Sequence, residues 1–259
     1  MTAVDWKGKR YWLIGASEGL GLSLAVQMRA AGANLILSAR SEAALAAAAR
    51  SVASDLASDL DGVMTVPVDV ADDASVRAAA AQIGPIDGVV FLAGVYWPMP
   101  AHKLDPAQLV AMCNINFTGC ARVIGAVLPG MVARGTGHVV ITGSLSGFRG
   151  LPGAMGYAAS KAGTMALAES LYCDLRATGI KVQLANPGFI RTRLTAKNDF
   201  SMPFLMEPEQ AAHAMFTHMN SDRFKVSFPT VFSWLFRLSQ FLPDWAYYRL
   251  FAPVSGRKP

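Results

Sequence analysis

Short apolar runs alternate with longer segments of helical periodicity along most of this chain. The runs that predict strands are 10–15, 34–39, 63–70, 87–94, 137–144, 181–188 and 223–229. Segments of helix length separate them, and this alternation is typical of βαβ units with parallel strands. Several runs are apolar almost throughout, as expected when helices cover both faces of a sheet. We therefore predict a single α/β domain over residues 1–259, a doubly wound parallel sheet of about seven strands with helices on both faces.

Two regions depart from this alternation. Residues 189–222 mix polar and apolar positions, and we predict a substrate loop or lid there. Residues 223–259 hold the last strand and an aromatic C-terminal tail with scattered basic residues. Three interpretations stay open for the tail: packing against its own domain or a partner subunit, an interfacial membrane anchor, and a cover over an apolar substrate.

Composition restricts the classes of function. Hydrophobic residues make up 53% of the chain and charged residues 16%, which supports a large core rather than disorder. The net charge of +5 comes from scattered basic residues, so we predict no nucleic-acid binding. The three cysteines form no C-x-x-C pair, and the four histidines show no metal-ligand spacing. We expect a metal-free protein of the reducing cytoplasm, with the tail as the candidate contact to a membrane.

A glycine-rich turn follows the first predicted strand. Gly15, Gly19 and Gly21 stand in the sequence IGASEGLG, between that strand and the first helix. Such glycines permit a tight turn and let the backbone approach a pyrophosphate, which the free N–H groups of the helix N-terminus can bind. The spacing alone fits a structural turn as well as a nucleotide site. Its position after the first strand favours the nucleotide site.

The second predicted strand ends in Ala39 and Arg40, where the adenosine ribose of a bound dinucleotide would lie. An acidic residue there binds the 2′-hydroxyl of NAD, whereas an arginine accommodates the 2′-phosphate of NADP. An ordinary solvated arginine is the alternative interpretation, and Glu18 in the glycine turn would repel a nearby phosphate. We predict that NADP(H) is preferred, with NAD(H) as the alternative.

Tyr157 and Lys161 lie four positions apart, and Ser144 lies thirteen positions before Tyr157. Residues four apart share one face of a helix, so the tyrosine and lysine side chains are expected to lie together. A neighbouring ammonium group and an oxidised nicotinamide ring both favour the phenolate, which would let Tyr157 exchange a proton with a carbonyl or alcohol oxygen. Ser144 is placed to hydrogen-bond the same oxygen, and nicotinamide would supply the hydride.

Together these residues resemble the short-chain dehydrogenase/reductase family, over nearly the whole chain. The resemblance implies a Rossmann-like fold in which Tyr157 is the general acid/base and Ser144 orients the substrate. It implies that Lys161 holds the nicotinamide ribose and lowers the pKa of Tyr157, and that Asn116 fixes a water that relays protons to Lys161. The implied dinucleotide-binding residues are Gly15, Ser17, Gly19, Leu20, Gly21, Arg40, Asp69, Val70, Ala93, Gly94, Tyr157, Lys161, Pro187, Gly188, Ile190 and Thr192.

Two positions depart from the family pattern. Ile14 stands where the family usually has Thr, and Leu92 stands where it usually has Asn. Replacing both partners of a buried polar contact by apolar groups is nearly neutral, whereas replacing one of them is costly. We therefore predict that the Ile14 and Leu92 side chains pack together at the C-terminal edge of the sheet.

The sequence thus predicts an NADP(H)-dependent oxidoreductase that interconverts a carbonyl and a secondary alcohol. Apolar stretches such as VYWPMP, after the fourth strand, favour an apolar substrate, and a subunit interface is the alternative interpretation of the same residues. The family resemblance implies a homodimer or homotetramer. Three other classes stay open: a non-catalytic dinucleotide sensor, a methyltransferase with the same strand–glycine–helix start, and a membrane-recruited interaction protein that relies on the tail.

Overall fold

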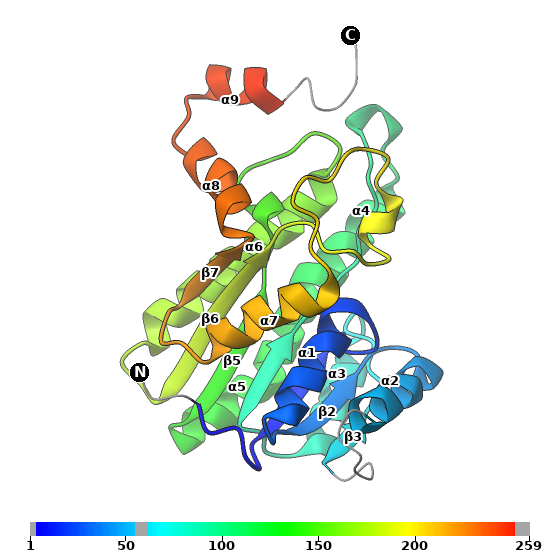
Figure 1. The fold of residues 1–259 in the computed structure, drawn as a ribbon, viewed down its shortest axis with the longest axis vertical. Helices are drawn as coiled ribbons and strands as arrows, with labels where there is room; N and C mark the ends of the chain where they lie inside the picture. The colour runs from blue at the N-terminus through cyan, green and yellow to red at the C-terminus, as the bar shows by residue number, and fades with distance from the viewer. Residues whose placement is uncertain (1–3, 55–61, 252–259) are drawn as a thin grey trace.

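A seven-stranded parallel sheet forms the centre of the protein (Figure 1). The computed structural model describes residues 4–54 and 62–251. The strands are β1 (Arg10–Ile14), β2 (Asn34–Ser38), β3 (Val63–Thr65), β4 (Gly88–Phe91), β5 (Gly137–Thr142), β6 (Ile180–Pro187) and β7 (Lys225–Phe228). Their order, β3-β2-β1-β4-β5-β6-β7, shows that the chain builds the sheet outward from β1 in both directions. The predicted Rossmann-like, doubly wound α/β fold is therefore confirmed.

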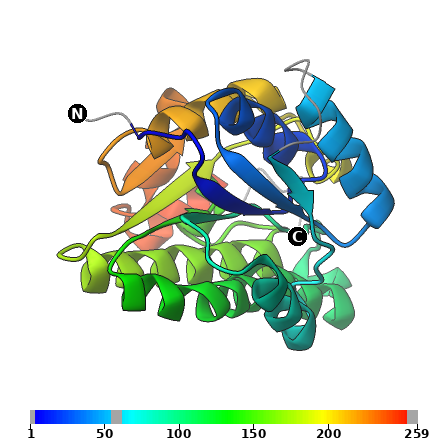
Figure 2. The same cartoon turned by 90° about the horizontal axis from the view of Figure 1, so that it is seen from below.

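Helices cover both faces of this sheet (Figure 2). They are α1 (Gly19–Ala30), α2 (Glu42–Ser54), α3 (Asp73–Ile83), α4 (Pro106–Met112), α5 (Gly119–Arg134), α6 (Met155–Leu175), α7 (Pro208–Met219), α8 (Thr230–Ser239) and α9 (Asp244–Phe251). Helices α1, α2 and α7 pack on one face, and α3, α5 and α6 pack on the other. Because successive strand residues point to opposite faces, β1 contributes Trp12 to one apolar core and Leu13 to the other.

The third strand is shorter than the sequence pattern predicts. Residues 63–70 form one run in the sequence, but only Val63–Thr65 is strand β3. The backbone continues along β2 for a short distance, since the N–H groups of Val66 and Val68 donate to carbonyls at 3.0 Å. However, β3 lies at the edge of the sheet and its single neighbour, β2, ends at Ser38. The apolar run 63–70 therefore extends beyond the end of β2, the strand with which it could pair.

Ile14 and Leu92 do not pack together, so this prediction is wrong. Ile14 on β1 is in register with Phe91 on β4. Ile14 and Phe91 belong to the core beneath α3, α5 and α6, whereas Leu92 packs against the core on the other face. The two residues meet only through their backbones, where the Leu92 N–H donates to the Ile14 carbonyl at 2.8 Å. An offset of one residue sends a strand side chain to the opposite face.

One long rod runs through α4 and α5. Its middle, Cys113–Thr118, is a π-helical segment. Within the described part of the chain, this rod over Pro106–Arg134 is the one helix long and apolar enough to cross a membrane, with a mean hydropathy of 1.4. Its residues Val123 and Met131 are nevertheless buried against the sheet. The rod therefore serves this fold as a core helix.

The last two helices extend beyond the C-terminal edge of the sheet (Figure 1). Arg149, in the loop before α6, fastens the turn between them. Its guanidinium donates to the carbonyls of Ser239 and Leu242, at 3.1 and 2.8 Å. It also pairs with Asp244 and lies 3.9 Å from the centre of the Tyr247 ring. The Arg149 guanidinium thus sets the position of α9 relative to the rest of the fold.

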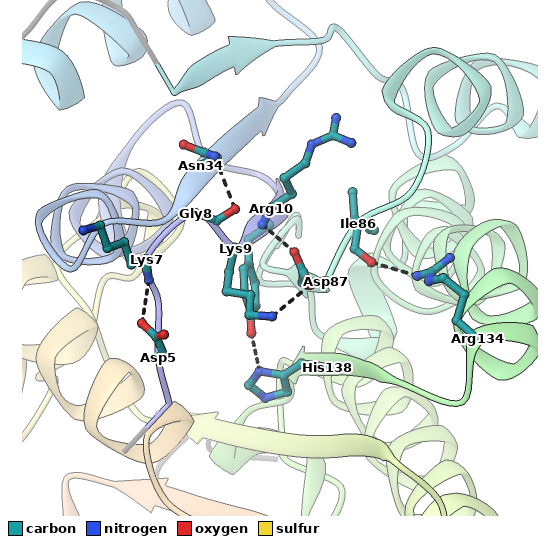
Figure 3. Close-up of polar contacts among 11 residues, drawn as sticks. Asp5, Lys7, Gly8, Lys9, Arg10, Asn34, Ile86, Asp87, Arg134 and His138 are labelled. Carbon is teal, nitrogen blue, oxygen red and sulfur yellow. Dashed lines mark hydrogen bonds and ion pairs between the residues drawn. The ribbon is translucent and has the colours of Figure 1, made fainter. Parts of the chain in front are cut away.

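Polar contacts around Asp87 and His138 lie at the opposite, N-terminal edge of the sheet (Figure 3). Asp87 accepts a hydrogen bond from the backbone N–H of Arg10 at 2.8 Å. The buried His138 ring lies 2.9 Å from the Tyr11 hydroxyl through Nδ1 and 2.8 Å from Gln183 Oε1 through Nε2. The Gln183 amide nitrogen donates to backbone carbonyls, so its oxygen must accept from His138 Nε2–H. Burial lowers the pKa of His138 to about 3, and the imidazole is neutral at pH 7.

Acid is expected to destabilise the fold through His138. Its folded-state pKa is about 3 and its ordinary value is 6.5, so below pH 6.5 the unfolded chain takes up a proton that the folded chain does not. Lowering the pH from 6.5 to 5 should therefore remove about 1.5 kcal/mol of unfolding free energy through this group. Urea unfolding at pH 6.5 and at pH 5 gives the loss of unfolding free energy on acidification. This loss should be about 1.5 kcal/mol smaller for His138→Gln than for the parent protein.

His213→Gln is the matched control, because His213 is exposed on α7. Its unfolding free energy should change with pH as that of the parent does. The same pH slope in the parent and in His138→Gln would contradict the assignment.

Candidate active site

A cavity of about 1260 Å³ lies at the C-terminal edge of the sheet, where β1, β2, β4, β5 and β6 end. The predicted site residues that line it are Gly15, Ser17, Gly19, Leu20, Gly21, Arg40, Asp69, Val70, Ala93, Gly94, Ser144, Tyr157, Lys161, Pro187, Gly188, Ile190 and Thr192. Asn116 is fully buried just behind the wall. Parallel strands end on the same edge, and this brings together turns that are far apart in the sequence.

The glycine turn is shaped by close backbone packing. Gly15 has a φ of +93°, and a Cβ there would lie 2.6 Å from the Ala93 backbone nitrogen. A Cβ on Gly21 would lie 2.1 Å from the Gly15 carbonyl oxygen. These contacts hold the N-terminus of α1 against the ends of β1 and β4, at the cavity. Helix N-termini in such turns suit an anionic pyrophosphate.

Glu18 precedes α1 as its N-cap residue, but its side chain does not cap the helix. Its carboxylate instead accepts a hydrogen bond from Arg193 Nε at 2.7 Å. The charge of Glu18 is therefore compensated within the protein, which weakens the objection that it would repel a phosphate. Arg40 lies exposed at the rim of the same cavity.

Ser144, Tyr157 and Lys161 meet on one wall of the cavity. Tyr157, in the first turn of α6, lies beside Ser144, which follows β5, and the interaction between their side chains favours the phenolate. Lys161 lies one turn further along α6 and is 3% exposed. Its ammonium group donates to the Thr142 carbonyl at 2.9 Å and lies 5.9 Å from the centre of the Tyr157 ring. Ser144 and Tyr157 can therefore act on one bound atom, with the Lys161 ammonium group nearby.

Burial controls the protonation of these groups. It raises the pKa of Tyr157, although the hydrogen bond with Ser144 acts in the opposite direction. It lowers the pKa of Lys161 to about 8, against the charge effect of the Cys120 thiol. In the protein by itself, loss of hydration is the largest influence on the Tyr157 pKa, because it disfavours the phenolate. The expected lowering of that pKa by Lys161 stays a prediction.

Asn116 joins the loop after β4 to α6. It lies in the π-helical segment, where its Oδ1 accepts from the Val95 N–H at 2.8 Å. Its Nδ2 donates to the Val95 carbonyl and to Ser160 Oγ, both at 3.0 Å. Ser160 directly precedes Lys161, so this clamp fixes the lysine relative to the loop. Proton relay by a water at Asn116 stays a prediction.

The cavity wall also contains a side-chain hydroxyl that the described residues leave without a hydrogen-bond partner. The buried Thr142 hydroxyl lines the cavity and has no hydrogen-bond partner within residues 4–54 and 62–251. At Gly94, a Cβ would lie 3.4 Å from Asn116 Oδ1 and 3.9 Å from Lys161 Nζ. The bare backbone there lets a ligand approach both groups. The glycine turn, the unpartnered Thr142 hydroxyl and the gap at Gly94 all suit an extended ligand with phosphate and hydroxyl groups.

Tyr96 is a site residue that no sequence motif indicates. Its ring packs edge-on against Tyr157 with 5.1 Å between ring centres, and burial raises its pKa to about 12. Lys197 donates to the Tyr96 carbonyl at 2.9 Å and lies 4.6 Å from the centre of the Trp97 ring. It fastens the loop after β6 to the loop after β4. The only signal in the sequence is the apolar stretch VYWPMP.

The predicted substrate loop is shorter than residues 189–222. Its last third is α7, and Ala212 and Met215 on this helix are buried in the core. Residues 189–207 are largely irregular, and many of them line the cavity. A lid role for this shorter segment stays a prediction.

The C-terminal tail supplies the far wall of the cavity. The residues involved are Phe232, Leu235, Phe236 and Phe251. The Phe232 ring contacts those of Phe189 and Phe204, with ring centres 5.7 and 5.5 Å apart. Helices α8 and α9 therefore pack on their own domain and form part of the cavity. Residues 252–259 of the predicted tail lie outside the described residues.

Comparisons with known proteins agree with this geometry. The family model described as short chain dehydrogenase matches residues 9–201. An uncharacterized oxidoreductase of Myxococcus xanthus is 38% identical over 236 residues, which cover 89% of this chain and 91% of that protein. A 3-dehydrosphinganine reductase of Arabidopsis thaliana is 35% identical over 189 residues, which cover 72% of this chain and 56% of that protein.

A solved structure gives the same result. It is a gluconate 5-dehydrogenase from Burkholderia cenocepacia J2315 in complex with NADP and tartrate, 26% identical with a TM-score of 0.76. The match covers 85% of this chain and 93% of that one. With the family model matching most of the chain and the predicted motifs meeting in one cavity, this protein belongs to the short-chain dehydrogenase/reductase family of oxidoreductases.

Proposed function

We propose that this protein is an NADP(H)-dependent oxidoreductase that interconverts a carbonyl and a secondary alcohol of an apolar substrate. The observation that carries the proposal is the meeting of Ser144, Tyr157 and Lys161 on one wall of the cavity that also holds the glycine turn. Bound nicotinamide would supply or accept the hydride. The protein's part is to hold the reactants and move the proton.

Different residues of the cavity would bind different parts of the dinucleotide. The N-terminus of α1 would bind the pyrophosphate, and Asp69 and Val70 would lie at the adenine. The Lys161 ammonium would hold the nicotinamide ribose, since the Thr142 carbonyl keeps it at the wall. The loop after β6, which includes Ile190 and Thr192, would lie at the nicotinamide end.

Tyr157 would donate its proton to the carbonyl oxygen in the reductive direction. Its raised pKa keeps the phenol protonated near neutral pH, and Ser144 lies beside it to hydrogen-bond the same carbonyl oxygen. The hydride would reach the carbonyl carbon as the proton reaches the oxygen. In oxidation Tyr157 must first lose its proton, which the nearby Lys161 cation and a positively charged ring beside the phenol would favour. In the protein by itself, the raised pKa of Tyr157 therefore favours the protonated phenol that the reductive direction requires.

Arg40 supports the choice of NADP(H). It is exposed at the rim, while the carboxylate of Glu18 is paired with Arg193. The similar gluconate 5-dehydrogenase was solved with NADP. An arginine at this position accommodates a 2′-phosphate, whereas NAD would leave it without a partner.

The walls of the substrate end support an apolar substrate. Tyr96, Met99, Leu151, Phe189 and Phe200 line the cavity beyond Tyr157. Similar proteins are named for different substrates, 3-dehydrosphinganine in one case and gluconate in another. The apolar wall favours the less polar of these two chemistries. Assembly as a homodimer or homotetramer and a cytoplasmic location are further parts of this proposal.

Removing the Tyr157 hydroxyl tests the proton transfer. We expect Tyr157→Phe to lower kcat for ketone reduction by about 10²–10⁴-fold, because general acid catalysis contributes that much. Dinucleotide affinity, measured by NADPH fluorescence, should stay within about threefold of the parent value, since the ring itself is kept.

Tyr96→Phe is the matched control, because Tyr96 contacts the Tyr157 ring without sharing the Ser144 bond. Its kcat should fall by less than about tenfold. Unimpaired turnover by Tyr157→Phe on a substrate that the parent reduces would refute the mechanism.

Exchanging Arg40 tests the dinucleotide preference. We expect Arg40→Ser to lower the ratio of kcat/KM for NADPH to that for NADH by about 10–100-fold, which corresponds to one hydrogen bond to a charged group. Arg77→Gln, on the exposed surface of α3, should leave the ratio unchanged. A parent protein that uses NADH as well as NADPH would defeat the proposed preference without touching the proton-transfer chemistry.

A further inference from the structure

The outward side of α8 is apolar, the reverse of an ordinary surface helix. Val231, Trp234, Leu235 and Leu238 follow an i, i+3, i+4, i+7 spacing, which places them on one side of the helix. Their exposed fractions are 73%, 48%, 46% and 57%. A helix whose polar side faced water would show the opposite pattern.

The inward side of α8 is polar enough to need internal hydrogen bonds. Ser233 and Ser239 are buried, and their hydroxyls donate to the carbonyls of Thr230 and Phe236 at 2.8 Å each. Phe232 beside them anchors the helix on the domain through its ring contacts. The orientation of α8 is therefore held by the fold, and its apolar residues are directed outward by that packing.

The turn after α8 and helix α9 carry further exposed apolar residues. Phe241 is 86% exposed and Trp245 is 72% exposed. We call the whole surface the outer face and define it as Val231, Trp234, Leu235, Leu238, Phe241, Trp245, Tyr248 and Leu250, all of them exposed. Both helices project from the end of the domain (Figure 1), so a large flat partner can reach them. Exposed apolar surface of this extent marks an interaction site.

The charges on this part of the chain have one sign. Residues 223–259 contain six basic residues and a single acidic one, Asp244. Asp244 is paired with Arg149. Arg237 lies 4.7 Å from the centre of the Trp234 ring, and Arg249 is exposed beside Tyr248. The outer face therefore presents aromatic and aliphatic groups beside Arg237 and Arg249. Glu169, which lies next to Trp234 and Phe241, is paired with Lys225.

We propose that the outer face binds the surface of an anionic lipid bilayer, with α8 and α9 lying in the interface. The two helices have ten and eight residues, too short to span the hydrocarbon core. Tryptophan and tyrosine prefer the headgroup level, and arginines bind lipid phosphates. A second copy of the chain is the other occupant of such a surface, and the test below distinguishes it from a bilayer.

This proposal is independent of the chemistry proposed for the cavity. It has a consequence for substrate access, however, since Leu235 belongs both to the outer face and to the cavity wall. Phe232 and Phe251 of the same helices also line the cavity. Docking would therefore bring the apolar end of the cavity next to lipid.

Vesicle flotation with the purified full-length protein tests the proposal. We expect binding to phosphatidylcholine vesicles that contain phosphatidylglycerol, and much weaker binding to phosphatidylcholine alone. Phe241→Ser/Trp245→Ser should lower the partition coefficient by at least about tenfold, because two exposed apolar side chains no longer enter the interface. Neither residue lines the cavity, so NADPH binding should be unchanged. Val110→Ser/Val132→Ser, exposed by 64% and 54% on the α4–α5 rod, is the matched control and should bind as the parent does.

Arg237→Gln/Arg249→Gln tests the charge contribution. It should weaken binding to the anionic vesicles by about thirtyfold, since each arginine near the surface contributes about fivefold. Failure of the parent to bind anionic vesicles would overturn the proposal, as would equal losses in the control variant. Light scattering gives the third overturning result: a fall in molar mass for Phe241→Ser/Trp245→Ser with unchanged vesicle binding would assign the outer face to a second copy.

Discussion

The buried hydrogen bond from Lys161 to the Thr142 carbonyl is the contact on which the site depends. It ties α6 to the end of β5 at 2.9 Å, and this connection places Tyr157 against Ser144. A buried ammonium group needs such a partner, because burying an unpaired charge is costly. Asn116 supports the arrangement by joining Ser160 to the loop after β4. One cation thereby fixes the relative position of two secondary structure elements and of the groups that carry the chemistry.

Loss of hydration, rather than pairing of charges, dominates the electrostatics of this site. Burial raises the pKa of Tyr157 and of Tyr96 and lowers that of Lys161. All three shifts favour the neutral form, although a pKa of about 8 leaves Lys161 mostly protonated at neutral pH. A charged ligand would therefore change the protonation of these groups strongly when it binds. The energetics of binding and of proton transfer are coupled through the same desolvated space.

The C-terminal helices serve two surfaces at once. Phe232, Phe236 and Phe251 face the domain and close the apolar end of the cavity. The outer face on the other side of the same helices is left to solvent or to a partner. Arg149 holds both sides in place. It binds the carbonyl of Ser239 at the end of α8 and that of Leu242 in the following turn, and it pairs with Asp244 at the start of α9. A contact made by the outer face is thus mechanically close to the substrate end of the cavity.

Local patterns in the sequence were sufficient to predict the layered fold and the glycine turn. They also placed Tyr157 and Lys161 on one helix face. Strand and helix periodicities and short-range spacing are encoded by neighbouring residues, so a local pattern can specify them. The tertiary structure alone decided the length of β3, which depends on where β2 ends, and the separation of Ile14 from Leu92, which depends on strand register. It also decided the raised pKa of Tyr157 and the outward direction of the apolar side of α8. Burial and register are properties of contacts between distant segments, and no local pattern specifies them.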